Sequence, residues 1–176
     1  MKYSKFNDYD HYKKQQIITN ENKVQHTWFV GFTAKYFYRL SSLLLESEEI
    51  SALCAGSRNG LEPRFFKDAG FKRAIGTDIA PTANIFPYMM QHDFHDIRPS
   101  YVKPFHCLYS NSFDHSYSIE LFLKACDSFL EENSLMFFDY SPSDNQHIDS
   151  FACSDGLMIN NDELTECVYK YTGYQM

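Results

Sequence analysis

The chain has 176 residues, of which 44% are hydrophobic and 22% are charged, and its formal charge is −7. This balance suits one globular domain with one core, and no apolar run approaches the ~20 residues of a membrane helix. Because the charge is acidic and Lys and Arg do not cluster, we expect no nucleic-acid substrate.

Five cysteines are spread along the chain without a CxxC pair. An odd number of widely spaced cysteines indicates reduced, buried thiols in an intracellular protein. The N-terminus is polar and carries no apolar signal region. We therefore expect a cytoplasmic protein without a membrane segment. The cysteines are Cys54, Cys107, Cys126, Cys153 and Cys167.

The first elements along the chain are expected to be helical. Residues 1–20 are polar and rich in Tyr and Lys, which predicts a short helix or a loose arm. Residues 23–46 place an apolar side chain at every fourth position, and this predicts a helix with one apolar face. The repeating residues are Val24, Trp28, Phe32, Tyr36, Leu40 and Leu44. We expect residues 1–49 to be a helical segment that packs on or caps a domain of residues 50–176.

From residue 50 onwards, apolar runs alternate with helical segments. This alternation implies right-handed crossovers and a parallel sheet, whose strands are apolar throughout because both faces are covered. We therefore predict a doubly wound α/β fold. The tail after Pro142 has room for one helix near 162–169 and one short strand, so we expect a shortened C-terminal part. The predicted strands are 50–55, 73–79, 89–93, 105–110 and 135–140, and the predicted helices are 61–69 and 118–132.

Ligands of a doubly wound sheet bind at the carboxyl ends of its strands. The first predicted strand ends in the turn Gly56-Ser57-Arg58-Asn59-Gly60. Glycines let the backbone turn tightly and approach a ligand, and the next helix directs its N-terminus to the same place. This arrangement suits a carboxylate or a phosphate, although a plain strand-to-helix turn often has the same glycines.

Three further strand ends carry polar residues. Asp78 follows the second strand, 18 residues after Gly60, near the spacing of a carboxylate that accepts hydrogen bonds from ribose hydroxyls. An acidic loop residue or a helix cap is the plainer interpretation. Asp93 and Phe94 close the third strand, where a carboxylate can accept from an adenine amino group while an apolar neighbour packs on the ring. Residues 109–115 form a polar cluster after the fourth strand.

From about residue 50 to residue 141, the chain resembles the nucleotide-binding half of class I S-adenosylmethionine-dependent methyltransferases. The motif that carries the resemblance is G-x-R-N-G-x-E, which begins at Gly56 and ends at Glu62. The resemblance implies that S-adenosylmethionine is the cofactor, with its methionine moiety at Gly56, its ribose at Asp78 and its adenine at Asp93. The residues expected to bind the cofactor are Gly56, Ser57, Arg58, Asn59, Gly60, Glu62, Asp78, Ile79, Asp93, Phe94, Asn111 and Ser112.

Methyl transfer to a small-molecule or sugar-type acceptor is the reaction that this resemblance implies. A hydroxyl acceptor needs a base, and His115 is the first candidate because imidazole titrates near neutrality. Asp114 would orient it, and His95 is the second choice, although a loop or helix-capping role for His115 fits equally well. No Asn/Asp-Pro-Pro-Tyr/Phe motif follows the fourth strand, so methylation of nucleobase or glutamine amino groups is not supported. A homodimer is compatible with the sequence.

The alternatives rest on weaker patterns. Cys54 stands near the place where the family usually has an acid, so Glu62 or Arg58 would take over part of its role. A nicotinamide enzyme needs G-x-G-x-x-G, and Arg58 occupies the middle glycine position. The cluster His92-Asp93-x-His95-Asp96 has metal-ligand residue types, but neighbouring residues of a strand point to opposite faces, so we expect no metal. A non-catalytic binding or partner subunit remains the alternative function.

Overall fold

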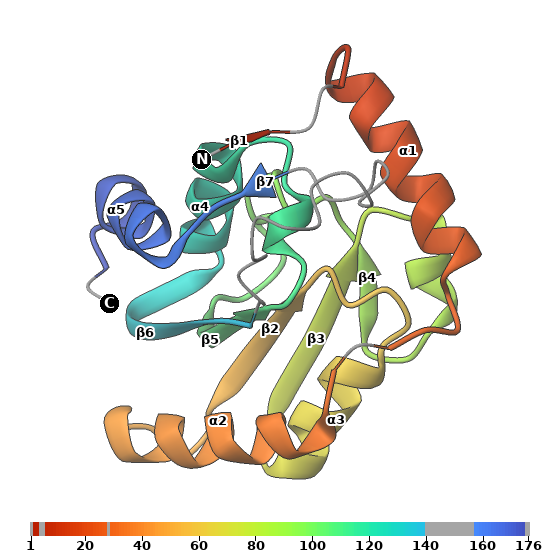
Figure 1. Cartoon of the computed structure of the whole chain (residues 1–176). Helices are drawn as coiled ribbons and strands as arrows, with labels where there is room; N and C mark the ends of the chain where they lie inside the picture. The colour runs from red at the N-terminus through yellow and green to blue at the C-terminus, as the bar shows by residue number, and fades with distance from the viewer. Residues whose placement is uncertain (1, 4–5, 28, 140–156, 175–176) are drawn as a thin grey trace.

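The computed structural model describes residues 2–3, 6–27, 29–139 and 157–174. At its centre is a parallel sheet of five strands in the order β4-β3-β2-β5-β6 (Figure 1). Helices cover both faces of this sheet, which confirms the predicted α/β class. The strands are β2 (Ser51–Ala55), β3 (Arg73–Asp78), β4 (Met89–Gln91), β5 (Phe105–Ser110) and β6 (Leu130–Phe138).

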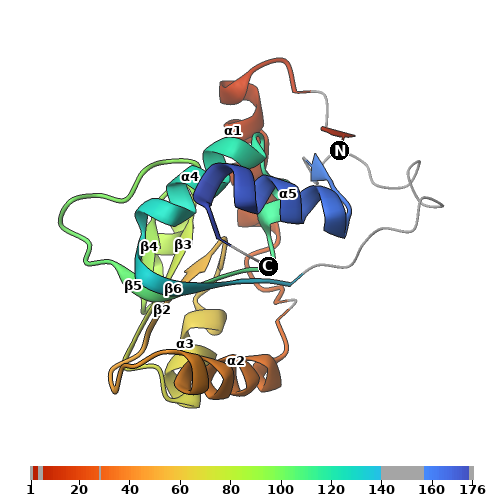
Figure 2. The ribbon, with the colours of Figure 1, turned by 90° about the vertical axis from the view of Figure 1, so that its left-hand side faces the viewer.

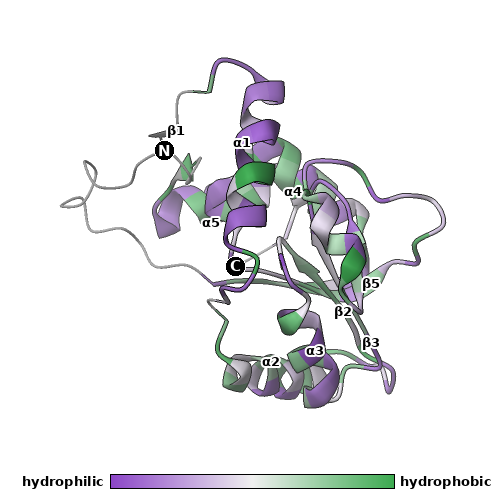
Figure 3. Cartoon of the chain, turned by 90° about the vertical axis from the view of Figure 1, so that its right-hand side faces the viewer, coloured by the Kyte–Doolittle hydropathy of each residue, from purple (hydrophilic) through white to green (hydrophobic). Residues whose placement is uncertain are grey.

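The helices form two layers. Helices α2 (Gly31–Leu44) and α3 (Leu61–Ala69) cover one face of the sheet, and α4 (Ile119–Ser128) and α5 (Asn161–Thr172) lie over the other (Figures 1 and 2). Helix α1 (Tyr9–Asn22) lies apart from both layers, and hydrophilic residues predominate along it (Figure 3). The remaining elements are the short helices η1 (Pro81–Ile85) and η2 (Phe113–His115) and the antiparallel pair β1 (Lys2–Tyr3) and β7 (Leu157–Met158).

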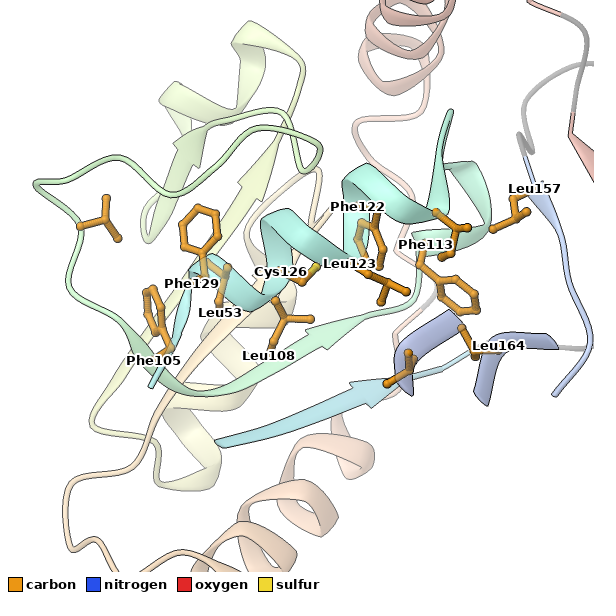
Figure 4. Close-up of a cluster of buried hydrophobic side chains, with 13 residues drawn as sticks. Leu53, Phe105, Leu108, Phe113, Phe122, Leu123, Cys126, Phe129, Leu157 and Leu164 are labelled. Carbon is orange, nitrogen blue, oxygen red and sulfur yellow. The ribbon is translucent and has the colours of Figure 1, made fainter. Parts of the chain in front are cut away.

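Side chains of β2 alternate between the two faces and so belong to two hydrophobic clusters. Leu53 lies in the cluster under α4 and α5, together with Leu108 and Phe122 (Figure 4). Ala52 and Cys54 lie in the other cluster, under α2 and α3. Every residue of β2 is buried, because a central strand of a parallel sheet is covered on both sides, and this explains its uninterrupted apolar run.

The strand order reverses between β2 and β5. The chain runs from β2 outwards through β3 to β4, then returns to the other side of β2 and continues from β5 to β6. A reversal of this kind leaves a crevice at the carboxyl ends of the two strands, where open α/β sheets bind their ligands.

The helix predicted over residues 23–46 is α2, which is shorter and begins only at Gly31, and the short helix expected as one of two possibilities for residues 1–20 is α1. The structure has two helices, α1 and α2, and residues 23–27 belong to the connector between them. The predicted apolar face is wrong, because Phe32 is 76% exposed and Tyr36 is 58% exposed, whereas Ala34 is fully buried. A strict four-residue spacing rotates by about 40° at each step around a helix of 3.6 residues per turn, so its members do not share one face. Trp28 lies outside the described residues.

Two strand bounds also differ from the prediction. β4 ends at Gln91 because the Asp93 carboxylate accepts a hydrogen bond from the backbone N–H of His95, which turns the chain. β6 begins at Leu130 and α4 ends at Ser128, since the chain already pairs with β5 through Phe129. The predicted helix in the tail is α5. The predicted short strand is β7, which pairs with β1 outside the main sheet. Pro142, Cys153 and the end of the fifth predicted strand lie outside the described residues.

Candidate functional site

Two small neighbouring cavities lie at the carboxyl ends of β2, β3 and β5. They share the wall formed by Gly56, Arg58 and Ser112, and their volumes are about 20 Å³ and about 10 Å³. The first is lined further by Gln16, Asn20, Asp78, Ile79, Phe94 and His115, and the second by His26, Thr27, Ser57, Asn59, Glu62 and Asn111. We call the two cavities together the crevice.

The structure brings most of the predicted site residues together in the crevice. Of the predicted set, Gly60, Asp93 and Asp114 are the members that do not line it. The lining also contains Gln16 and Asn20 of α1, and His26 and Thr27 of the connector, none of which belongs to the predicted set. The hydrophilic sequence of α1 has no periodic apolar pattern that would have placed it against the sheet.

The turn after β2 is fixed by hydrogen bonds to β3. The backbone N–H groups of Gly56 and Ser57 both donate to the carbonyl oxygen of Thr77, at 2.9 and 2.8 Å. Gly56 has φ +83°, and a Cβ there would lie 2.7 Å from the Cβ of Ser112. Glycine is therefore required both by the left-handed backbone and by the close approach of the loop after β5. The same turn delivers the backbone N–H of Arg58 towards the centre of the crevice.

Asp78, at the end of β3, is the central carboxylate of the crevice. It is 2% exposed and accepts hydrogen bonds from the backbone N–H groups of Ala80, at 2.8 Å, and Arg58, at 3.2 Å. The amide nitrogen of Asn20 lies 3.0 and 3.1 Å from its two oxygens. Burial raises the pKa of Asp78, and these hydrogen bonds oppose the rise. Together, the two carboxylate oxygens thus face donors from α1, the turn and the residues directly after β3.

Asp93 joins α1 to the loop after β4. Its carboxylate accepts hydrogen bonds from the hydroxyl of Tyr9, at 2.6 Å, and from the ring Nδ1 of His95, at 2.9 Å. Nε2 of His95 accepts from the backbone N–H of Tyr117 at 3.1 Å, which assigns the ring proton to Nδ1. Burial alone would raise the pKa of Asp93, but the donors outweigh it and lower the pKa. Asp93 does not line the crevice, whereas the next residue, Phe94, does, and the Phe94 ring stacks on His95.

Glu62, in the first turn of α3, is a buried carboxyl. It accepts a hydrogen bond from the amide of Asn111 at 3.0 Å and lies 2.6 Å from the hydroxyl of Ser57. That hydroxyl also lies 2.9 Å from the carbonyl oxygen of Cys54, and its single proton can serve only one of the two acceptors. Burial raises the pKa of Glu62 to about 7, so a protonated Glu62 can donate to Ser57 while Ser57 donates to Cys54.

Two residues of the G-x-R-N-G-x-E motif hold the connector between α1 and α2. The amide nitrogen of Asn59 donates to the carbonyl oxygen of Val24 at 2.9 Å and to the hydroxyl of Thr27 at 3.0 Å. The guanidinium of Arg58 donates to the carbonyl oxygen of His26 at 3.2 Å. The motif therefore fixes the segment that follows α1 as well as the turn after β2.

The two candidate bases differ in their surroundings. His115, in η2, lines the first cavity with its side chain 25% exposed, and its Nε2 lies 3.9 Å from the carboxylate of Asp114. Both ring nitrogens of His95 are engaged and the residue is 7% exposed, so His115 is better placed to act on a ligand. Nε2 of His92 pairs with the backbone carbonyl of Asp96 at 2.9 Å. Within the described ranges, no three His, Cys, Asp or Glu residues are arranged to hold a metal ion.

The chain matches no known family profile, and no curated protein matches its sequence. A chain of the complex between the Haloferax volcanii Trm112 methyltransferase activator and a protein assigned as a methyltransferase matches with a TM-score of 0.63 and 12% identity, over 96% of this chain and 77% of that one. The sugar N-methyltransferase KedS8 from Streptoalloteichus sp ATCC 53650 matches with a TM-score of 0.53 and 13% identity, over 83% of this chain and 60% of that one.

This chain also spans 50% of the length of Streptomyces venezuelae DesVI, with 15% identity, a TM-score of 0.48 and coverage of 61% of this chain. At such identities the likeness shows the fold: the chain has a Rossmann-like α/β fold that solved methyltransferase structures share. Among the described residues, no helix is both long and apolar enough to cross a membrane.

Proposed function

We propose that this chain is an S-adenosylmethionine-dependent methyltransferase that binds its cofactor in the crevice and acts on a small-molecule or sugar-type acceptor. The observation that carries the proposal is the meeting of the Gly56 turn with Asp78 at the carboxyl ends of β2 and β3, beside the point where the strand order reverses. The fold is shared with solved methyltransferase structures, and this supports the same class of activity.

The residues of the crevice fit the chemical groups of S-adenosylmethionine. The two oxygens of Asp78 suit the two hydroxyls of a ribose, because a carboxylate accepts from a pair of donors. Ile79 and Phe94 offer apolar surface for an adenine ring. Glu62, as a carboxylate, would stabilise the positive charge of the methionine ammonium or the sulfonium, and would so take over part of the role of the acid that the family usually has near the position of Cys54.

His115 is the residue that we assign to proton transfer. The bound cofactor would supply a methyl group on a sulfonium, and its transfer is an in-line displacement in which the protein contributes position and electrostatics. His115 would take the proton of an acceptor hydroxyl on its imidazole ring, which lines the first cavity beside Asp114. The Asp114 carboxylate, 3.9 Å from Nε2, would stabilise the imidazolium that forms.

A non-catalytic partner subunit is the second candidate function. Three apolar side chains of α2 are largely exposed, Phe32 at 76%, Leu43 at 75% and Leu44 at 59%, and exposed apolar groups favour interaction surfaces. The Haloferax volcanii structure is a complex with a methyltransferase activator, which supports the same idea. Under this proposal the chain would bind a partner through α2, with or without a cofactor in the crevice.

Calorimetric titration with S-adenosylmethionine and S-adenosylhomocysteine tests the proposed function. The Asp78→Ala variant should lose at least tenfold in affinity, since it removes hydrogen bonds to a charged group. Asp68→Ala is the matched control, because Asp68 is an exposed acid on α3, and it should bind like the wild type. If neither ligand binds the wild-type chain, the methyltransferase proposal fails and the partner-subunit function becomes the leading one.

A further inference from the structure

Helix α1 closes the crevice through contacts near both of its ends. At its C-terminal end, the amide of Asn20 contacts both oxygens of Asp78. At its N-terminal end, the hydroxyl of Tyr9 donates to Asp93. Between them, Gln16 is 5% exposed and lines the first cavity. The helix thus holds both carboxylates that follow β3 and β4.

We infer that α1 is a gate, which must swing away from Asp78 and Asp93 before a nucleoside-containing ligand can bind in the crevice. The inference rests on the proposed function for the identity of that ligand. In the closed arrangement the two cavities measure about 20 and 10 Å³, whereas sites for ligands of this size measure about 300–1,000 Å³. The amide of Asn20 also occupies both oxygens of Asp78, which are the atoms that would accept hydrogen bonds from a pair of ribose hydroxyls.

The gate is attached outside the two hydrophobic clusters of the sheet. No residue of α1 belongs to either hydrophobic cluster of the sheet. Besides Asn20, Tyr9 and the buried Gln16, α1 contacts the domain through an aromatic group, in which Tyr9 and the fully buried Tyr12 pack edge-on or tilted against His95 and Tyr117. A segment held by polar and aromatic contacts outside the main core can open without unfolding the sheet.

The connector supplies the fixed point of the movement. Asn59 and Arg58 bind the backbone of residues 24 and 26, directly after the end of α1 at Asn22. These hydrogen bonds come from the turn after β2 and do not involve α1 itself. The helix can therefore rotate about residues 23–27 while the connector stays in place. Asn20 lies close to this point and Tyr9 lies about 16 Å further along the helix, so Tyr9 moves furthest.

Opening and ligand binding are then coupled. The apparent affinity of a ligand that binds only the open form is its affinity for that form multiplied by the fraction of molecules that are open. A variant that opens the gate more often therefore binds the ligand more tightly. Tyr9→Phe removes the hydrogen bond to Asp93 and keeps the ring, and Tyr9 does not line the crevice. We expect this change to raise the open fraction about tenfold, because the loss of one weak hydrogen bond to a charged group changes an equilibrium by about that factor.

Amide hydrogen exchange of the full chain, without ligand, tests the gate directly. Because an isolated helix of this length is marginal in water, α1 frays when it opens, and exchange within residues 9–22 should be about tenfold faster in Tyr9→Phe than in the wild type, while the strands stay unchanged. Tyr36→Phe, the same chemical change at an exposed position of α2, is the control. Asn20→Asp, which places a second carboxylate against Asp78, should also accelerate exchange in α1. If α1 exchanges at the wild-type rate in both variants, or together with the strands, the gate is refuted.

Titration with S-adenosylhomocysteine separates this inference from the proposed function. Apparent affinity about tenfold higher in Tyr9→Phe, with faster exchange in α1, would support both. Faster exchange in α1 without binding to any variant would retain the gate and refute the proposed cofactor. Binding to the wild type with no change of either quantity in Tyr9→Phe and Asn20→Asp would retain the cofactor and refute the gate.

Discussion

Replacing Glu62 by Gln should stabilise the folded chain above neutral pH and leave its stability unchanged at low pH. Glu62 is buried, and burial raises the pKa of its carboxyl from 4.5 to about 7. The folded chain therefore holds this proton more tightly than the unfolded chain does. Its contribution to the free energy of unfolding is fully present below about pH 4.5 and is lost as the pH rises through about 7.

The magnitude follows from the size of the rise. At about 1.4 kcal/mol for each pKa unit, the difference between 4.5 and about 7 corresponds to about 3 kcal/mol lost by the wild type at pH values above both. A Gln side chain reproduces the protonated carboxyl. Its oxygen can accept from Asn111, and its amide can donate to Ser57, which then donates to the carbonyl of Cys54. The variant should keep the stability that the wild type loses.

Urea unfolding of both proteins at about pH 4 and about pH 8.5 measures the effect. The two free energies of unfolding should be nearly equal at the lower pH, and the variant should be about 3 kcal/mol more stable at the higher one. Asp68→Asn, an exposed acid of the same helix, should show no such difference. A Glu62→Gln variant that is less stable than the wild type at pH 8.5, or a difference that does not change with pH, would refute the reasoning.

Three further predictions concern the crevice. His115→Ala should lower turnover of a hydroxyl acceptor by about 10²–10⁴-fold and leave the affinity for S-adenosylhomocysteine unchanged. Normal turnover in steady-state kinetics would contradict the role of His115 as the base. Gly56→Ala should destabilise the fold by about 1–3 kcal/mol, because of its φ of +83° and its approach to Ser112; a wild-type urea midpoint would show that the turn can shift. Affinity for S-adenosylmethionine should increase as the pH rises through about 7, because Glu62 then becomes an anion beside a cationic ligand. Calorimetry between about pH 6 and pH 8 checks this, and constant affinity would exclude the contact.

Local sequence patterns predicted much of the sheet. The second strand was expected over 73–79 and β3 spans Arg73–Asp78, while the helix expected over 61–69 is α3 with the same bounds. These elements lie in the centre of the fold, where apolar runs are short and glycines end them. The turn at Gly56 and the acid at Asp78 could be placed for the same reason, since the end of a parallel strand fixes where its next residues lie.

The N-terminal segment could not be predicted in this way. Its four-residue apolar spacing pointed to a face that α2 leaves exposed, and the hydrophilic sequence of α1 carried no signal for its position. The contact of Asn20 with Asp78 joins residues 58 positions apart, and that of Tyr9 with Asp93 joins residues 84 apart. Nothing within either segment specifies such a pair.

The sequence by itself determined the class of the fold, the strand ends that form the crevice and the chemical types of the residues there. Only the tertiary structure decided what those residues contact: Asp93 faces Tyr9 and His95, and Asn59 holds the connector. The reason is physical. Burial preference is a property of each side chain and repeats with the period of its helix or strand, whereas a polar group accepts whichever donor the folded chain brings within hydrogen-bonding distance.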